Sequence, residues 1–354
     1  MENLLEEFYN ADLIIEKFHP RKFFIDEKNY HIWGITQTGK TKLLKSYLLS
    51  LTKGRYLYIN CKDLRIDYNA LNSSLATFCK ENKIEVLALD NYHPTIKLFP
   101  MKQILLSSEY PYTVAEMIRI HLYPLDYEEF LAYEHKYDSS ALNHFFKLGS
   151  FPAMHKVNSD ERVFYVQKML QLSLTQIELD ILSYCAKFFA QKISAYMLYQ
   201  RLKSIRKISK DKLYSSFEDL SLKRYIHLVE KIDHPKATKK VYLCDISLKV
   251  ALSTEKNFAK LFENMIFLEL LKAKHTLYYE ENVEFYLPSL SEVILSTPFT
   301  DERTLFKKIQ AIEAFIIHYQ IKKITAVTMN KEVNIAHPFS KVEMVPFDIW
   351  ALRD

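Results

Sequence analysis

The strongest chemical signal in this sequence is an eight-residue stretch, residues 34–41, that reads Gly-Ile-Thr-Gln-Thr-Gly-Lys-Thr. It matches the phosphate-loop pattern G-x4-G-K-[ST] at every position. Two glycines at this spacing let main-chain amides turn inward around phosphate oxygens. In this pattern Lys40 reaches the β- and γ-phosphates of ATP, and the hydroxyl of Thr41 binds Mg²⁺. The residues that we expect around the nucleotide are Gly34, Thr36, Gln37, Thr38, Gly39, Lys40, Thr41 and Lys42.

A second signal is the acid that ends an apolar run at residues 83–90, Asp90. A phosphate loop needs such a strand to hold the metal, so we expect Asp90 to share Mg²⁺ with Thr41; a turn aspartate after a buried strand is the alternative. The next residue is Asn91, where many ATPases place a glutamate that polarises water. Because an amide cannot accept a proton as a carboxylate does, we predict weak or slow hydrolysis. Lys40, Asp90 and Asn91 are therefore the candidate catalytic residues.

Polar residues also end the apolar run at residues 103–108. In folds of this kind a polar residue such as Ser107 can sense the γ-phosphate, although a helix cap or turn is an equally good interpretation. Glu109 is a conceivable substitute for the glutamate that is missing at position 91. Its simpler interpretation is a solvated loop acid.

The elements that must position these residues are those of an α/β fold. Residues 29–33 read as a short buried strand and residues 42–49 as an amphipathic helix, so the loop joins a strand to a helix. Strands that alternate with helices predict a parallel sheet covered by helices. Further strands are expected at residues 55–60, 83–90 and 103–108, and further helices at residues 68–81 and 113–120.

Composition places the chain among globular proteins of two or three domains. It has 354 residues, of which 49% are hydrophobic and 26% charged. The longest stretch without a charged residue, residues 68–79, is too short to span a membrane. The four cysteines lie far apart with no C-x-x-C pair, and the acidic N-terminus does not resemble a secretory signal. We therefore expect a cytoplasmic protein without a membrane segment.

Residues 119–131, which read RIHLYPLDYEEFL, resemble the R-x-x-x-L-x-PLSF-x-EF signature of a prokaryotic family. Its members are AAA-type P-loop ATP-binding proteins with a C-terminal restriction-endonuclease-like domain of unknown function. Arg119 is then a candidate phosphate or interface arginine, with a surface ion pair as its other interpretation. Weaker matches follow in the same order at residues 149–152 (GSFP against GGFP), 242–248 (YLCDISL against Y-F-x-D-x-G-L), 261–270 (LFENMIFLEL against FEN-x-V-x-x-EL) and 278–285 (YYEENVEF against YYW…EVDF).

The C-terminal region departs from the family pattern where a nuclease would need its metal site. Glu284 stands in the place of the aspartate of EVDF, and the later E-x-K reads Glu292-Val293-Ile294. A metal-dependent nuclease needs acids for Mg²⁺ and usually a lysine that positions the nucleophile. The missing lysine argues for a degenerate domain without nuclease activity, and Glu263 reads as a helix acid or polar contact.

The middle of the chain carries the positive charge. Residues 179–244 read like a winged helix, with helices at 181–189, at 194–202 and from about 209, then strands at 225–229 and 240–243. Residues 201–240 hold twelve lysines and arginines and five acids, a charge of +7, which leaves −2 for the rest of a chain of net charge +5. This segment is where a recognition helix and wing would meet nucleic-acid phosphates. A solvated face or an interdomain contact is the alternative.

We therefore predict an α/β P-loop NTPase with a parallel sheet (residues 1–135), a winged-helix-like module (136–240) and a degenerate restriction-endonuclease-like α/β domain (241–354). The protein is predicted to be a Mg-ATP-binding AAA-type ATPase that binds ATP and ADP. It would act as a nucleotide-dependent switch on nucleic acid. The alternative is a nucleic-acid-binding regulatory or defence-type protein in which nucleotide is structural. A small-molecule kinase is a weaker third hypothesis. Because AAA-type relatives often assemble, a homo-oligomer is also considered.

Overall fold

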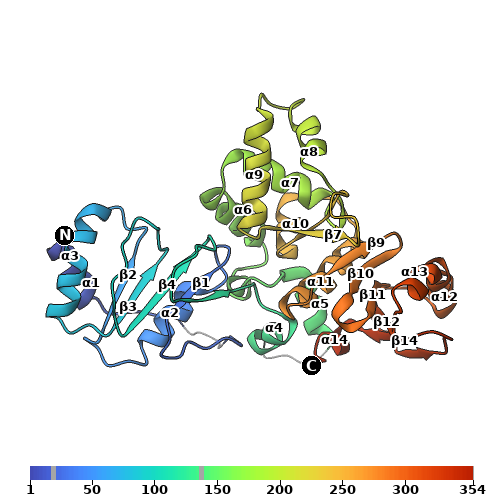
Figure 1. Cartoon of the computed structure of the whole chain (residues 1–354), viewed down its shortest axis with the longest axis horizontal. Helices are drawn as coiled ribbons and strands as arrows, with labels where there is room; N and C mark the ends of the chain where they lie inside the picture. The colour runs from blue at the N-terminus through green and yellow to red at the C-terminus, as the bar shows by residue number, and fades with distance from the viewer. Residues whose placement is uncertain (17–20, 135–138, 354) are drawn as a thin grey trace. The chain divides into compact units, whose positions relative to one another are not determined.

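The computed structural model describes residues 1–16, 21–134 and 139–353 (Figure 1). The chain divides into two compact units, Met1–Tyr123 and Pro124–Asp354. The predicted division into three domains at residues 135 and 240 stays a prediction. None of the described helices is long and apolar enough to cross a membrane.

Within the described residues, the first unit holds a five-stranded sheet of order β2-β3-β4-β1-β5 in which every pair is parallel. Parallel neighbours require crossover connections, which the helices supply. The α/β fold with a parallel sheet is therefore confirmed. The strands are β1 (Tyr30–Trp33), β2 (Tyr56–Asn60), β3 (Val86–Asp90), β4 (Gln103–Ser108) and β5 (Ile118–His121), and the helices are α1 (Glu2–Asn10), α2 (Lys40–Leu48) and α3 (Tyr68–Glu81).

The helix predicted at residues 113–120 is wrong. This segment is a loop followed by β5, the edge strand that pairs with β1 from Ile118 opposite Tyr30 onward. Ile118 and Ile120 alternate with Arg119 and His121, which is the period of a strand. The main-chain N–H and C=O groups on the side of β1 away from β4 need hydrogen-bonding partners, and β5 supplies them. This tertiary contact outweighs the local helix propensity of the segment.

Alternate residues of β3 face two different cores. Leu87 and Leu89 belong to the cluster that α1 and α3 cover, whereas Val86 and Ala88 belong to the cluster that contains Leu44 of α2. Because successive side chains of a strand point to opposite faces, α2 lies on the face away from α1 and α3. This packing fixes the start of α2 at the carboxyl end of the sheet.

In the described part of the second unit, nine strands form one sheet of order β13-β14-β12-β11-β10-β9-β7-β8-β6. Its strands are β6 (Gln191–Lys192), β7 (Ile226–Lys231), β8 (Lys240–Leu243), β9 (Tyr278–Glu280), β10 (Val283–Leu287), β11 (Glu292–Ser296), β12 (Lys323–Thr328), β13 (Val333–Ile335) and β14 (Lys341–Pro346). Its helices are α4 (Tyr127–Glu134), α5 (Ser139–Leu148), α6 (Arg162–Ser173), α7 (Gln176–Lys187), α8 (Ala195–Leu202), α9 (Lys210–Leu222), α10 (Ile246–Leu252), α11 (Phe258–Lys272), α12 (Glu302–Ala311), α13 (Glu313–His318) and α14 (Phe347–Trp350).

The three helices and two strands predicted for the basic middle region are present as α7, α8, α9, β7 and β8. Ser194 and Ser209, at the predicted starts of the second and third helices, cap α8 and α9 by accepting hydrogen bonds from main-chain amides three residues on. The β7–β8 hairpin does not stand apart, because β7 also pairs with β9 through Glu230 and Lys231. The hairpin and the C-terminal strands therefore share one sheet.

Two of the family-like motifs meet in the second unit although they are far apart in sequence. Asp245, which caps α10, accepts hydrogen bonds from the main-chain amide and the hydroxyl of Ser150. Gly149 has a φ of +73°, and a Cβ there would clash with the side chains of Asp245 and Ser247. Packing at the start of α10 thus explains why glycine stands at position 149 and aspartate at position 245.

A buried ion pair stabilises the helical part of the second unit. Lys223 Nζ donates to Glu178 Oε1 at 2.7 Å, and their side chains are 9% and 4% exposed. Burial raises the pKa of Glu178, but Lys223 and the capping residue Thr175 outweigh it, so the pKa lies below its usual range. The pair therefore stabilises the charged carboxylate inside the fold.

We predict that Lys223→Met lowers the free energy of unfolding by about 3 kcal/mol, because it leaves a buried carboxylate uncompensated. Lys231→Met is the matched control: its 2.8 Å pair with Glu280 is 27% and 22% exposed, and its loss should cost under about 1 kcal/mol. Because the folded pKa of Glu178 is depressed, its contribution is present above about pH 4.5 and is lost as pH falls below that value. Urea unfolding at pH 7 and pH 4 measures both effects, and equal losses in the two variants would contradict the assignment.

Candidate nucleotide-binding site

The predicted phosphate loop joins β1 to α2 at the carboxyl end of the parallel sheet. The amide of Gly34 donates to Ser108 O at 3.1 Å, and a Cβ on Gly34 would lie 2.5 Å from Leu122 O. Position 34 therefore requires glycine, because the main chain that follows β5 passes too close for a side chain. Gln37 and Gly39, with φ of +64° and +96°, turn the chain into α2.

The loop presents main-chain donors around the start of α2. Among the described residues, no acceptor lies within hydrogen-bonding geometry of the main-chain amides of residues 36–41. The N-cap, Gly39, has no side chain that could accept from them. Amides at a helix N-terminus, together with the helix dipole, bind phosphate groups well.

Lys40 lies folded against this loop. Its Nζ donates to Gly34 O at 2.6 Å and to Ile35 O at 2.7 Å, and the residue is 7% exposed. Burial lowers the pKa of Lys40 to about 8, against the opposing charges of Glu109 and Asp90. The ammonium is thus poorly solvated and held by neutral carbonyls, so an anion brought to the loop would stabilise it.

Asp90 is the centre of the site's hydrogen bonds. The residue is 2% exposed, and its Oδ2 accepts from Thr41 Oγ1 at 2.7 Å and from Tyr58 OH at 2.8 Å. Its Oδ1 accepts from Ser107 Oγ. Burial and the neighbouring carboxylate raise the pKa of Tyr58 well above its usual range. The structure thus brings together Thr41, Asp90 and Ser107, three of the predicted site residues.

Asn91 is held beside this group in a left-handed conformation, with φ of +57°. Its amide N–H donates to Ser107 Oγ at 3.0 Å, and its Nδ2 donates to Asn60 Oδ1 at 2.9 Å. Asparagine tolerates this backbone conformation better than most residues. The side chain is therefore fixed at the sheet edge by a neutral partner.

Three residues at the site were missed from the sequence. Tyr58 and Asn60 lie near the carboxyl end of β2, next to β3, and polar residues ending a strand beside Asp90 were the available signal. Arg21 is 5% exposed and donates to Thr38 O at 2.8 Å and to Tyr123 O at 2.9 Å. It links the loop to the end of the unit, a contact for which the sequence offers no local signal.

The remaining predicted residues are placed less centrally. Arg119, on the edge strand, pairs in register with His31 and donates to Pro111 O at 3.3 Å, so the structure does not bring it to the loop. Lys42 lies 3.5 Å from Glu16. Thr36 is half-buried and Gln37 exposed on the outer turn of the loop. Glu109 is held 3.3 Å from Lys62, and its charge acts on Lys40.

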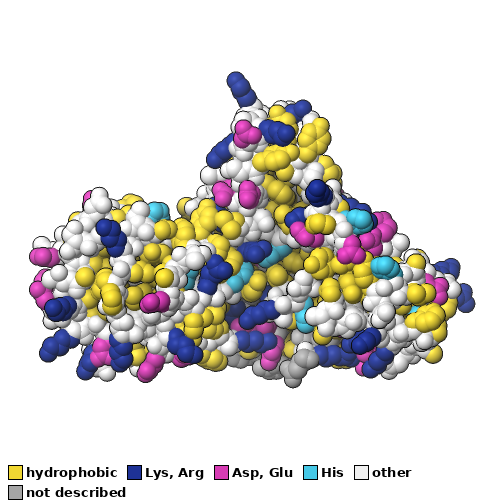
Figure 2. Space-filling view, in the orientation of Figure 1, with side chains coloured by type: hydrophobic (Ala, Val, Ile, Leu, Met, Phe, Trp, Pro, Cys, Tyr) yellow, Lys and Arg dark blue, Asp and Glu magenta, His cyan; other side chains and the backbone are white. Residues whose placement is uncertain are grey.

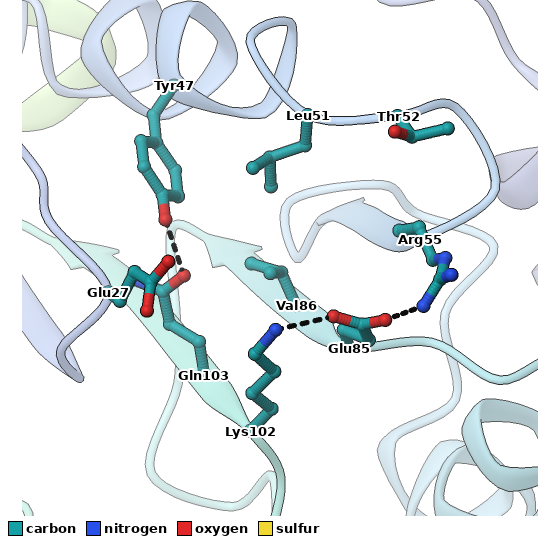
Figure 3. A pocket seen from close by; sticks show the side chains of 9 residues that line it. All are labelled: Glu27, Tyr47, Leu51, Thr52, Arg55, Glu85, Val86, Lys102 and Gln103. Carbon is teal, nitrogen blue, oxygen red and sulfur yellow. Dashed lines mark hydrogen bonds and ion pairs between the residues drawn. The ribbon is translucent and has the colours of Figure 1, made fainter.

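A separate cavity of about 300 Å³ lies at the other end of the sheet (Figure 3). It opens where β3 and β4 begin, with Glu85 paired to Arg55 and to Lys102 across it, the latter at 2.7 Å. Tyr47 OH donates to Gln103 Oε1 at 2.8 Å on its far side. Because the predicted phosphate loop follows the carboxyl end of β1, this cavity is distinct from the candidate nucleotide site.

The acids expected at a nuclease centre lie on opposite faces of the C-terminal sheet. In the antiparallel pair of β10 and β11, Leu287 is opposite Glu292 and Tyr286 opposite Val293, so Glu284 and Glu292 point to different faces. Glu284 pairs with Lys308 at 2.8 Å. Glu292 pairs with Lys323 at 3.1 Å on the other face. These two carboxylates therefore cannot share a metal ion.

Comparisons with known proteins give limited guidance. No family model matches the chain. The uncharacterised protein MJ1544 of Methanocaldococcus jannaschii is 24% identical over 407 residues, which cover 97% of this chain and 91% of that protein. The Orc1 protein of Aeropyrum pernix, solved in complex with DNA, aligns over 66% of this chain and 88% of its own with 12% identity and a TM-score of 0.29. So low a score carries no argument about fold or function.

We predict that Gly34→Ala lowers the free energy of unfolding of the first unit by about 2 kcal/mol or more, because its Cβ meets a main-chain carbonyl. The matched control is Gly54→Ala in the same unit. Gly54 also has positive φ, but its Cβ would meet only the hydroxyl of Tyr9 at 3.3 Å, and we expect a loss of about 1 kcal/mol. Denaturant titration measures the difference, and a smaller loss for Gly34→Ala would contradict the packing described here.

Proposed function

We propose that this chain is a Mg-ATP-binding ATPase of the AAA type that acts as a nucleotide-dependent switch and hydrolyses ATP slowly. The observation that carries the proposal is the 2.7 Å hydrogen bond from Thr41 Oγ1 to Asp90 Oδ2. Two residues predicted from the sequence as Mg²⁺ ligands thus meet at the mouth of a loop whose amides face no protein acceptor among the described residues.

The residues fit a metal-bound triphosphate. A hydroxyl and a carboxylate supply oxygen ligands, which Mg²⁺ prefers, and substrate phosphates normally complete its coordination. When bound, Mg²⁺ would neutralise charge on the phosphates. Lys40 would exchange the carbonyls of Gly34 and Ile35 for phosphate oxygens, and the amides of residues 36–41 would bind the remaining ones.

A route for the switch runs through Ser107. Its hydroxyl donates to Asp90, accepts from the amide of Asn91, and belongs to the strand that leads to Glu109. A ligand that draws Asp90 onto a metal would alter this hydrogen-bond set, so the bound and free states would differ in the chain segment after β4. Slow hydrolysis follows from Asn91, which offers water no basic group.

Removal of the lysine tests nucleotide binding. We expect Lys40→Ala to abolish Mg·ATP binding in isothermal titration, because a buried cation facing the phosphates is lost. In the parent, affinity should fall above pH 8 by up to about tenfold per pH unit as the free protein's ammonium deprotonates. Lys62→Ala, which removes a solvent-exposed cation nearby, is the control and should bind normally. Full binding by Lys40→Ala would refute the proposal.

Restoration of a carboxylate tests the explanation for slow hydrolysis. We predict that Asn91→Glu raises the rate of phosphate release, provided that the variant still folds despite its positive φ. Asn91→Ala is the matched control, since it loses the contact with Asn60 without adding a base. A rate that stays unchanged or falls in Asn91→Glu while Mg·ATP still binds would show that this position does not limit hydrolysis.

A second candidate function is nucleic-acid contact by the basic middle region, which we propose as a winged-helix-like module. The structure separates its cations into two groups. Four of those near the hairpin are paired with carboxylates, Lys223 with Glu178, Lys231 with Glu280, Lys239 with Glu230 and Lys240 with Glu263, while Arg224 and Lys236 are exposed. Those at the junction of α8 and α9 are exposed: Arg201, Lys203, Lys207, Lys210 and Lys212. Because more exposed cations gather at the helical junction than near the hairpin, phosphate contact is favoured at the junction.

If nucleotide proves merely structural, the same surface supports the alternative role of a nucleic-acid-binding regulatory or defence-type protein. The proposed homo-oligomer and the boundaries at residues 135 and 240 accompany either function as proposals. Duplex and single-stranded DNA titrations at about 50 mM salt, with and without Mg·ATP, separate the two: only a switch makes DNA affinity depend on the nucleotide.

A further inference from the structure

A pocket of about 650 Å³ lies between α7 and α8 in the second unit, beside the exposed cations of the α8–α9 junction. Tyr184 of α7 lines it together with Phe188, the residue that caps the end of α7, and Ile205 lines it from the segment after α8. Ile205 is 70% exposed. The pocket is therefore an open, partly aromatic surface with no apolar cover among the described residues.

Two aromatic rings form one wall of the pocket. Tyr184 of α7 and Phe188, the residue that caps the end of α7, are one turn apart. Their ring centroids are 4.7 Å apart with the planes tilted by 43°, and both residues are half-buried. Rings held in this way lose little conformational freedom when another ring packs against them. Stacking of a nucleobase on such side chains is sequence-tolerant, because every base has a π-face.

Cations surround this wall. Arg201 and Arg206 line the pocket, Arg206 is paired with Asp180 at 3.0 Å, and Lys187 lies 5.7 Å from the centre of the Phe188 ring. Arg201 is exposed on α8. Lys187 is also paired with Glu255 at 3.1 Å. Of the three lining cations, Arg201 is the one without an ion pair among the described residues, and it favours an anionic ligand with an aromatic part.

The charge continues outside the pocket. Lys203, Lys207 and Lys210 are exposed along the segment that follows α8, and residues 201–212 contain six cations and one acid. Figure 2 shows Lys and Arg side chains around a hydrophobic patch on the lobe that carries α8 and α9. An extended polyanion with flat apolar groups along it matches this surface better than an isolated nucleotide or a flexible acidic peptide.

We propose that the α7–α8 pocket takes an unpaired base of single-stranded nucleic acid, whose phosphates follow the exposed cations of residues 201–210. In a duplex the bases are already stacked and paired, so only an unpaired base can enter a pocket and lie against Tyr184. The inference rests on the nucleic-acid contact proposed above and specifies its ligand class and its site.

The test uses the full chain and matched variants of Tyr184. Fluorescence anisotropy follows binding of a 2-aminopurine-labelled DNA strand, its RNA counterpart and the blunt duplex. Tyr184→Ala should weaken single-strand binding roughly 5- to 150-fold and remove the quenching of 2-aminopurine, whereas Tyr184→Phe, which keeps the ring, should retain both. Circular dichroism confirms that both variants fold.

A second pair of variants tests the path of the phosphates. Arg201→Ala with Lys207→Ala should reduce the slope of log affinity against log salt by about 0.7 for each phosphate contact removed. Lys231→Ala with Lys239→Ala removes the same charge from the hairpin and should leave the slope unchanged.

The outcomes separate this inference from the proposed function. Absence of any nucleic-acid binding at about 50 mM salt overturns both this inference and the proposed nucleic-acid contact, and leaves the proposed ATP binding to its own test. Equal binding of duplex and single strand, equal affinity of Tyr184→Ala and Tyr184→Phe, or equal competition by inorganic polyphosphate overturns the base pocket alone and leaves a charge-only contact. DNA and RNA arms that differ would show which strand the pocket prefers, and either preference supports an unpaired base.

Discussion

The carboxylate of Asp90 is the interaction on which the candidate site depends. A buried charge loses its hydration, and that cost is offset only when donors replace water. Here hydroxyl groups from α2, β2 and β4 all donate to one carboxylate: those of Thr41, Tyr58 and Ser107. The same contacts hold three elements together at the end of the sheet, so the need to satisfy one charge also assembles the groups that would receive a metal ion.

Lysine serves three different purposes in this chain, and burial decides which. Lys40 is buried against main-chain carbonyls, and burial lowers its pKa to about 8, so a bound anion would stabilise its ammonium group. Lys223 is equally buried but is neutralised by Glu178, so it stabilises the fold. Lys207 and Lys210 are exposed, and their charge is available to a polyanion. A count of positive residues does not distinguish these cases, because the difference lies in solvation and partners.

In the second unit, strand register decides which side chains lie on the same face of the sheet. An offset of one residue exchanges the two faces of a strand, so the acids that the sequence aligns with a nuclease motif are separated by the sheet itself. Register also joins the β7–β8 hairpin to β9, so that the hairpin extends the C-terminal sheet while α7, α8 and α9 carry the open pocket. The surface that we propose for an outside ligand is therefore helical.

The α/β class and most strands of the first unit were predictable from the sequence, because each depends on residues close together in the chain. The roles assigned to the loop of residues 34–41, to Asp90 and to Ser107 stay predictions. Arg21, Tyr58 and Asn60 could not be assigned, since they reach the site from other elements. The edge strand β5 was taken for a helix, because only β1 beside it requires a strand there. By itself the sequence determined which local groups could bind phosphate and metal. The tertiary structure alone decided which charges are buried, which are paired and which face solvent, because those properties arise from contacts between distant residues.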